Sequence, residues 1–316
     1  MKILITDKMA EEAIKILKDA GHSVTFNEMD HETLLKNIVN YDALMIRGRT
    51  KVVKEIIEAG KNNLKVIGRA GIGVDNVDIE AASKYKIPVV NAPTGATSSV
   101  AELALGHMLT LSRSISLADK SMKNGEWLKK KLKGYELNGK TLGLIGTGNI
   151  GKLTGNLCKA FGMKVIGFDP FISKTDMAKD EIEKVEKLEK LMEKADYISL
   201  HLPHNPKTHY IVDEKMISKM KPTAFIINCA RGGTVDEKAL YKALKDNKIA
   251  GAGMDVFEEE PPKDKKFFEL DNVVLTPHIG ANTVEGQIKA GTICAGQIVK
   301  VLNGNKPDFC VNKKMI

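Results

Sequence analysis

Residues 142–151 read Leu-Gly-Leu-Ile-Gly-Thr-Gly-Asn-Ile-Gly, a short apolar run that leads directly into three glycines at the spacing GxGxxG. The apolar run predicts a buried strand, and the pattern that follows it through Phe161 predicts a helix. Gly146 permits a tight turn, Gly148 lets a phosphate approach the backbone, and Gly151 lets helix and strand pack closely. Because a helix N-terminus offers free N–H groups and a positive dipole end, this segment predicts a dinucleotide site.

A second predicted strand, at residues 164–168, ends in Asp169, about twenty residues beyond the glycines. A carboxylate at this point accepts hydrogen bonds from a ribose diol and repels a 2′-phosphate. No arginine follows it closely, so the residues favour NAD over NADP. A structural turn with a surface aspartate is the alternative, but it leaves the order of strand, glycines, helix and acid unexplained.

Short apolar runs alternate with helical patterns along the rest of the chain. Such alternation predicts parallel sheets that are covered by helices on both sides. The expected fold class is therefore α/β, with two doubly wound parallel-sheet domains, a Rossmann cofactor domain and a flavodoxin-like substrate domain. Strands are predicted at residues 3–6, 43–46, 65–67, 89–90, 141–145, 164–168, 197–200, 224–227, 252–254 and 273–275, and helices at 9–19, 51–59, 78–85 and 284–302.

The length of 316 residues exceeds what one core usually supports, so two domains are expected. Residues 1–97 and 284–316 are assigned to a discontinuous substrate domain, and residues 98–283 to the NAD-binding domain. A single long helix is predicted over residues 98–122, with a stop near Asn124-Gly125.

The composition excludes several classes of protein. The formal net charge of +8 comes mostly from lysines spread along the chain, and aromatic residues make up only 5%, so a nucleic-acid binder is not expected. No apolar run is long enough to cross a bilayer, and the first residues read as a strand rather than a signal peptide. The four cysteines lack metal-ligand spacing and suit a reducing compartment. We expect a cytoplasmic protein without a metal site.

Three polar residues follow separate predicted strands, where open α/β sheets place their ligands. Arg231 has the planar fork that binds a carboxylate through two hydrogen bonds. His278 suits acid–base chemistry, because an imidazole exchanges its proton near neutral pH. Glu260 suits the role of its partner, since a carboxylate beside an imidazole favours the protonated ring and fixes its orientation. Taken singly, each of the three also has an ordinary structural explanation.

The order of these motifs resembles the D-isomer-specific 2-hydroxyacid dehydrogenase family, essentially from end to end of the chain. After GxGxxG come Asn-Cys-Ala-Arg-Gly-Gly at 228–233, Asp-Val-Phe-x-x-Glu-Pro at 255–261 and Pro-His-Ile-Gly at 277–280. The resemblance implies an NAD-dependent oxidoreductase that acts on a small anionic D-2-hydroxy or 2-keto acid, with no nucleic-acid or membrane partner. It also implies a homodimer that forms through the helix at 98–122.

The resemblance assigns roles residue by residue. It makes His278 the acid/base, Arg231 the substrate anchor and Glu260 the partner of the histidine, and the following proline selects Glu260 over Glu258 and Glu259. The residues that it implies for cofactor binding are Ile72, Gly146, Gly148, Asn149, Ile150, Gly151, Asp169, Leu202, Pro203, Cys229, Ala230, Arg231, Asp255, His278, Gly280 and Ala281, with Asp255 at the nicotinamide amide.

Segments 46–52 and 67–78 are most similar to family members that convert D-3-phosphoglycerate to 3-phosphohydroxypyruvate, in serine biosynthesis. Arg47, together with Arg69 or Arg49, is then expected to bind the phosphate, and backbone amides near Gly71 and Gly73 the carboxylate. Pairing with surface acids is the alternative for these arginines. The chain stops soon after its last predicted helix, so no regulatory domain is expected.

Two alternatives stay open on the sequence. Relatives that reduce glyoxylate or hydroxypyruvate, or that oxidise D-lactate, share the same motifs. A different class of protein, an NAD-sensing binding protein similar to a corepressor, would use the same fold without turnover. The complete set of Arg231, Glu260 and His278 favours an enzyme.

Overall fold

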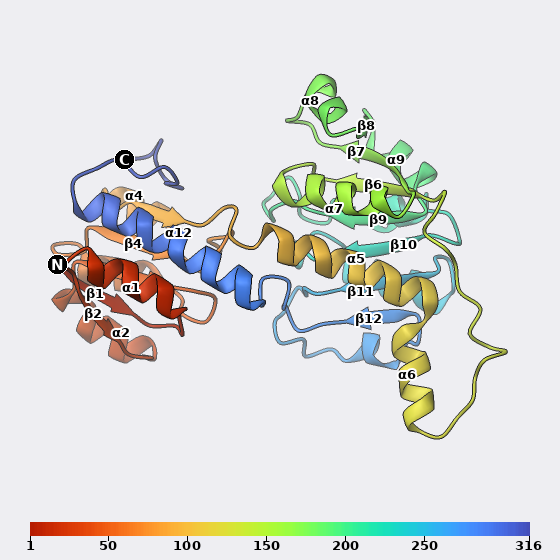
Figure 1. Ribbon diagram of the computed structural model, residues 1–316, viewed down its shortest axis with the longest axis horizontal. Coiled ribbons are helices and arrows are strands. Elements are labelled where there is room, and N and C mark those ends of the chain that lie inside the picture. The colour runs from red at the N-terminus through yellow and green to blue at the C-terminus, as the bar shows by residue number, and fades with distance from the viewer. The chain divides into compact units, whose positions relative to one another are not determined.

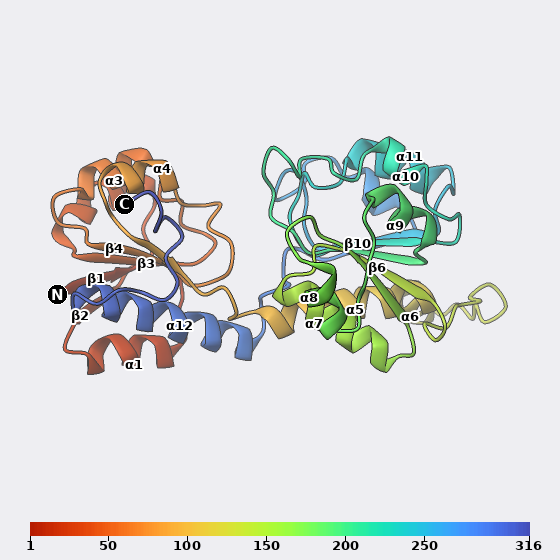
Figure 2. The ribbon, with the colours of Figure 1, turned by 90° about the horizontal axis from the view of Figure 1, so that it is seen from above.

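The computed structural model describes residues 1–316, which divide into two compact units. The first unit contains Met1–Thr97 and Ala281–Ile316, and the second contains Ser98–Gly280. Each unit has its own parallel sheet with helices on both faces (Figure 1 and Figure 2), which confirms the predicted fold class. The allocation of substrate to the first unit and NAD to the second stays a prediction. None of the helices has both the length and the apolar character needed to cross a membrane.

The first unit is built on five strands, β1 (Lys2–Ile5), β2 (Ser23–Phe26), β3 (Ala43–Ile46), β4 (Val66–Arg69) and β5 (Val89–Asn91). They pair in parallel in the order β2-β1-β3-β4-β5, which is the flavodoxin-like order. The central strands are buried and rich in Ile, Leu, Val and Met, as expected for a sheet that is covered on both faces.

The last helix of the chain, which is far in sequence from the rest of the first unit, completes the core of that unit. Figure 2 shows α1 (Glu11–Asp19) and α12 (Val284–Leu302) together on one face of the sheet. A side chain at Gly68 of β4 would lie only 2.5 Å from Ile298 and 2.8 Å from Cys294, both on α12. This close packing explains why the end of the chain belongs to the first unit. The other face carries α2 (His31–Asn37), α3 (Lys54–Gly60) and α4 (Ile79–Lys84), with the short η1 (Ile38–Asn40).

The second unit is built on seven strands, β6 (Thr141–Ile145), β7 (Lys164–Phe168), β8 (Glu183–Lys184), β9 (Tyr197–Leu200), β10 (Phe225–Asn228), β11 (Gly251–Met254) and β12 (Val273–Leu275). Their order is β12-β11-β10-β9-β6-β7-β8, with every pair parallel. From β6 the chain runs outward through β7 to β8, then returns to β9 on the other side of β6 and runs outward to β12. The order therefore reverses between β6 and β9. Open α/β sheets bind dinucleotides at this reversal.

Helices cover both faces of the second sheet as well. Figure 2 shows α5 (Thr97–Arg113) and α7 (Asn149–Ala160) on one face, and α9 (Leu188–Lys194), α10 (Glu214–Ile217) and α11 (Glu237–Lys245) on the other. The remaining helical segments of this unit are α6 (Ile115–Lys123), α8 (Lys174–Lys179) and η2 (Lys266–Glu269).

The prediction of one long helix over 98–122 is wrong at a single residue. Ser114 has a left-handed backbone with φ 51° and ψ 39°, so α5 ends at Arg113 and α6 leaves in another direction (Figure 1). The physical reason is a competing hydrogen bond. The carbonyl of Ser112 accepts from the N–H of Tyr135 at 2.8 Å, a residue of the returning loop. The helical pattern shows nothing of this interaction, because its partner lies more than twenty positions along the chain.

Candidate active site

The parallel register aligns the last residues of six strands of the second unit. The residues that follow them therefore lie at one edge of the sheet. The loops that carry Arg231, Glu260 and His278 begin at this edge. In spatial order, the residues that follow the strand ends are Asp169, Gly146, His201, Cys229, Asp255 and Thr276.

The glycine loop is tight against the protein and open toward solvent. Gly146 has a φ of +91°, and a side chain there would overlap the carbonyl of His201. A side chain at Gly151 would in turn overlap the carbonyl of Gly146, whereas at Gly148 nothing lies within 4 Å. The loop ends where α7 begins, so the unpaired N–H groups of that helix lie beside the open position. This arrangement fits a pyrophosphate.

Asp169 lies directly over the glycine loop. Its Oδ2 accepts from the N–H of Thr147 at 3.0 Å, and its Oδ1 accepts from the N–H of Phe171 at 2.9 Å. A carboxylate has about four lone-pair positions, so acceptor capacity remains for the hydroxyls of a ribose.

Glu260 and His278 form a hydrogen-bonded pair. His278 Nδ1 lies 2.7 Å from Glu260 Oε2, and the two side chains are 48% and 37% exposed, so both are within reach of a ligand. Burial acts to raise the pKa of Glu260, but the hydrogen bonds from His278 and Phe257 and the charge of Arg231 outweigh it and lower the pKa below 4.5. An ionised carboxylate only accepts hydrogen bonds, so Nδ1 carries the proton and Nε2 is left to exchange one.

Arg231 lies on a loop that a buried asparagine holds in shape. Asn228, 4% exposed, donates to the carbonyl of Arg231 at 3.0 Å and accepts from the N–H of Ala230 at 3.1 Å. The next residue, Gly232, is so close to the carbonyl of Phe257 that a side chain would overlap it. The loop of Arg231 therefore adjoins the loop of Glu260, in agreement with the effect of its charge on the pKa of that carboxyl.

Asp255 organises the loop that carries His278. It is 1% exposed, and its carboxylate accepts from Thr276 Oγ1 at 2.6 Å and from the N–H groups of Ile279 and Gly280, both at 2.8 Å. A contact between Asp255 and the nicotinamide amide stays a prediction. The roles of Asn228 and Thr276 were not predicted, although a polar residue at the end of an apolar strand is a signal that would have found both.

The first unit places the predicted phosphate ligands around a buried aspartate. Asp7, 3% exposed, accepts from the N–H of Arg47 and from Thr50 Oγ1 at 2.7 Å, and forms an ion pair with Arg49 Nε at 3.3 Å. Arg49 is thus paired, whereas the guanidinium of Arg47 donates to the carbonyl of Lys8 at 3.4 Å. Arg69 ends β4, directly before the loop with Gly71, Ile72 and Gly73.

The remaining predicted cofactor residues are divided between the two units. Leu202 and Pro203 follow β9, and the buried Cys229 and Ala230 follow β10. Ala281 is the first residue of the last segment of the first unit. A hollow of about 340 Å³ lies beside the Glu260–His278 pair, and its other lining residues are mainly apolar: Phe257, Pro261, Pro262, Phe268, Leu275, Thr276 and Pro277.

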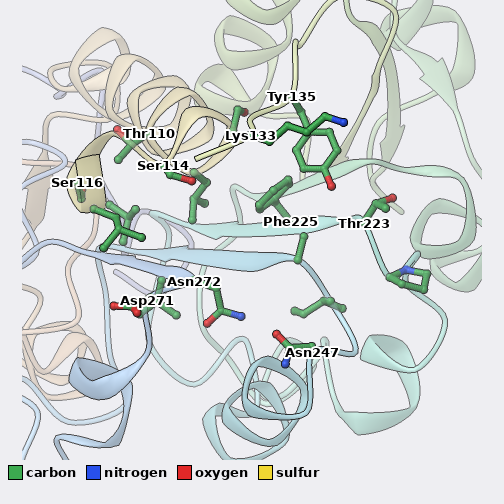
Figure 3. A pocket seen from close by; sticks show the side chains of 18 residues that line it. Thr110, Ser114, Ser116, Lys133, Tyr135, Thr223, Phe225, Asn247, Asp271 and Asn272 are labelled. Carbon is green, nitrogen blue, oxygen red and sulfur yellow. The ribbon is translucent and has the colours of Figure 1, made fainter. Parts of the chain in front are cut away.

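A second hollow, of about 400 Å³, lies at the opposite edge of the same sheet. Figure 3 shows Thr223 and Phe225 at the start of β10 and Asn272 just before β12, with Ser114 and Lys133 across from them. None of the predicted chemical residues lines this hollow. It is therefore not the candidate active site.

The sequence and the fold are similar to those of known proteins. The family model described as "D-isomer specific 2-hydroxyacid dehydrogenase, NAD binding domain" matches residues 105–280. The chain is 51% identical to D-3-phosphoglycerate dehydrogenase of Methanocaldococcus jannaschii over 99% of its own length but only 59% of that protein's length. It is 46% identical to hydroxypyruvate reductase of Thermotoga maritima, over 95% of this chain and 98% of the relative. The crystal structure of a glyoxylate reductase from Paecilomyes thermophila superposes with a TM-score of 0.91 at 28% identity, over 99% of each chain.

Proposed function

The chain belongs to the D-isomer specific 2-hydroxyacid dehydrogenase family, and from this premise we propose that it transfers a hydride between NAD and C2 of a D-2-hydroxy acid. The observation that carries the proposal is the pair of Glu260 and His278, in which Oε2 and Nδ1 are 2.7 Å apart. The charge of Arg231, on the adjoining loop, acts on the same carboxylate. The named relatives are dehydrogenases and reductases, so the alternative of an NAD-sensing binding protein gains no support.

NAD is the cofactor, and Ser98–Gly280 is the unit that binds it. The glycine loop at 146–151 and the start of α7 hold the pyrophosphate, with Asn149 and Ile150 supplying N–H groups. Asp169 binds the ribose diol of the adenosine half. Asp255, Cys229 and Ala230 line the nicotinamide end, and Leu202 and Pro203 lie on the adenosine side. The family resemblance adds Ile72, Gly280 and Ala281 to the cofactor-binding residues.

Arg231, His278 and Glu260 divide the work of substrate binding and proton transfer. When bound, NAD supplies the acceptor for the hydride that leaves C2, and NADH supplies the donor in the reverse direction. Arg231 binds the substrate carboxylate through its planar fork and so fixes which face of C2 is presented. His278 Nε2 accepts the hydroxyl proton during oxidation, and Glu260 stabilises the imidazolium that results. In reduction, the same imidazolium returns the proton to the carbonyl oxygen.

The preferred substrate is D-3-phosphoglycerate, whose product is 3-phosphohydroxypyruvate. The similarity to D-3-phosphoglycerate dehydrogenase supports this choice, and so do the cations of the first unit, Met1–Thr97 with Ala281–Ile316. Arg47 and Arg69 bind the phosphate, whereas Arg49 is occupied by Asp7. Backbone N–H groups near Gly73 help Arg231 to bind the carboxylate, whereas the N–H of Gly71 is occupied by the carbonyl of Arg69 at 2.8 Å. Hydroxypyruvate, glyoxylate and D-lactate are the competing substrates, as the names of the relatives suggest.

A substrate screen tests the proposal. We expect NADH oxidation with 3-phosphohydroxypyruvate to exceed that with hydroxypyruvate, glyoxylate or pyruvate. Arg47→Ala removes a charge-assisted phosphate contact, which corresponds to a loss of about 10- to 100-fold in kcat/KM for the phosphorylated compound. The unphosphorylated compounds are the internal control and should change less than about twofold. Equal losses on all four compounds would refute the phosphate assignment, and no turnover of any would refute the enzyme.

A homodimer forms through residues 98–122, which cover most of α5 and α6. Ile115 and Met122 of α6 are 49% and 56% exposed, and a second copy would cover these large apolar side chains. Sedimentation of the parent protein should give twice the mass of one chain, and Met122→Lys should lower it. A parent protein that sediments as a monomer refutes the assignment.

The protein functions in the cytoplasm, in agreement with its four free cysteines, and cell fractionation tests this location.

A further inference from the structure

A buried histidine outside the proposed catalytic set contacts the loop of His278. His107 on α5 is 2% exposed, and its Nε2 lies 3.1 Å from Thr276 Oγ1. Its ring lies close to Gly253 of β11, where a Cβ would be only 2.5 Å from the ring Nδ1. Nδ1 itself has no hydrogen-bond partner in the protein. One ring nitrogen of His107 therefore makes a hydrogen bond within the protein, and the other makes none.

The directions of the protons in this contact follow from simple counting. The carboxylate of the buried Asp255 accepts three hydrogen bonds. Thr276 has one hydroxyl proton, which it donates to Asp255 Oδ1 at 2.6 Å. Its oxygen is then an acceptor toward His107, so His107 Nε2 carries the proton. The neutral Nε2–H tautomer leaves a bare Nδ1, in agreement with the absence of a partner there.

Asp255 connects this contact to the proposed acid/base. Its backbone carbonyl accepts from the N–H of His278 at 2.8 Å, and its carboxylate accepts from the two N–H groups that follow His278. His278 has a φ of +52°, a left-handed conformation that residues other than glycine disfavour. The contacts to Asp255 therefore hold His278 in an unfavourable backbone conformation.

We propose that His107 and Thr276 are positioning residues for His278, through hydrogen bonds that run from His107 Nε2–H to Thr276 and from the Thr276 hydroxyl to Asp255. The kinetic consequence rests on the proposed function of His278 as the acid/base, whereas the tautomer of His107 does not. The side chains of His107 and Thr276 do not touch the substrate in this proposal. They fix the Asp255 carboxylate, around which the loop of His278 is folded.

The ring of His107 stays neutral in this arrangement. Burial lowers the pKa of His107 below 6.5, and Asp255, the charged group that acts on this ring, opposes burial without overcoming it. A second proton would also create an N–H at Nδ1 that has no acceptor. We therefore expect a ring that does not titrate where exposed histidines do.

Nitrogen NMR of the intact protein with labelled histidine tests the tautomer without any turnover. The signal of His107 is identified by its loss in His107→Gln. We expect it to show the Nε2–H tautomer and to stay unchanged over the pH range in which ordinary histidines titrate. A ring that carries its proton on Nδ1, or that titrates with the exposed histidines, overturns the proposal.

Kinetics test the positioning role. Thr276→Val keeps the branched shape but removes the hydroxyl, and kcat should fall about tenfold while KM for the 2-keto acid and Kd for NADH change less than about twofold. Thr276→Ser is the matched control and should restore kcat to within about threefold of the parent. His107→Phe should lower kcat in the parent but add little in Thr276→Val, because both changes break one chain.

The failures of the two proposals are distinguishable. If the parent protein oxidises NADH with no 2-keto acid, the proposed function is wrong, while the NMR result on His107 still stands. If the parent turns over and folded Thr276→Val, checked by its melting temperature, keeps its kcat, the positioning role is wrong and the enzyme assignment stands. A loss that serine does not restore also contradicts the positioning role.

Discussion

Glu260→Gln removes the charge beside His278 while keeping the size and the acceptor oxygen of the side chain. The proposed mechanism requires Glu260 to stabilise the imidazolium that forms when His278 takes the substrate proton. Glutamine can still accept from Nδ1–H, so the orientation of the ring is retained. The substitution removes the charge of the carboxylate together with the hydrogen bond that Oε1 accepts from the N–H of Phe257 at 3.1 Å, and it should lower kcat without affecting the binding of NADH.

The magnitude follows from the geometry of the pair. The two atoms are 2.7 Å apart, and the side chains are 48% and 37% exposed. At this distance, two unit charges attract by about 1.5 kcal/mol in bulk water and about 6 kcal/mol at an effective dielectric constant of about 20. Because water reaches both side chains, the lower part of this range applies. A loss of about 2 kcal/mol of transition-state stabilisation corresponds to about a 30-fold fall in kcat.

The assay is the steady-state oxidation of NADH with the best 2-keto acid, together with NADH binding followed by fluorescence. Glu259→Gln is the matched control, because Glu259 is the preceding residue and pairs with the exposed Lys263. The control should keep kcat within about twofold of the parent. If Glu260→Gln also keeps kcat within twofold of the parent, the reasoning about this pair is wrong.

The effect of pH on this difference has a definite sign. The pKa of Glu260 is lowered below 4.5, so its carboxylate is ionised at and above that pH. The difference in kcat between the parent and Glu260→Gln should therefore be constant through the neutral range. It should shrink only as the pH falls through the lowered pKa, and the stability that this carboxylate contributes is lost over the same interval.

Further predictions concern the cofactor loop and the cysteines. Gly151→Ala forces a Cβ onto the carbonyl of Gly146 and should weaken NADH binding at least about tenfold, measured by fluorescence titration. Asp169→Ser removes the acceptor for the ribose diol and should raise the ratio of kcat/KM for NADPH over NADH about tenfold. Burial raises the pKa of Cys158 and of Cys294 to about 12, so neither should react with a thiol reagent until the protein is unfolded; rapid alkylation of native protein at either would contradict their burial.

The regular elements were predictable because strong local patterns fix them. The strands at 141–145, 164–168, 197–200 and 273–275 and the helix at 284–302 agree with the structure at both ends. The edge strand β2 was not predicted, because its residues are mostly exposed and its sequence, Ser-Val-Thr-Phe, is short. An edge strand needs fewer apolar residues than a central one, so its periodic signal is weak.

The residues that could not be predicted depend on contacts between distant segments. The break at Ser114 needs the N–H of Tyr135. The hydrogen bond of His107 needs Thr276, which lies near the opposite end of the second unit in sequence. The apolar neighbours of His107 in the sequence predict only a packed core residue. His107 is buried, but it also makes a hydrogen bond that no local pattern reveals.

One device recurs at the loops that carry the proposed chemistry. Asp7 follows β1, Asn228 ends β10 and Asp255 follows β11, and each is less than 5% exposed. Each accepts backbone N–H groups from a loop that carries a proposed functional side chain: Asp7 from the loop of Arg47, Asn228 from the loop of Arg231, and Asp255 from the loop of His278.

This device links stability to function. Removal of any of these acceptors leaves buried donors unpaired, at a cost of about 1–3 kcal/mol for each donor. The same removal frees a loop whose side chain must be fixed within a fraction of an ångström for catalysis. Substitutions at Asp7, Asn228 and Asp255 should therefore lower both the melting temperature and kcat/KM. A buried residue elsewhere in the sheet, such as Ile226, should change the melting temperature alone.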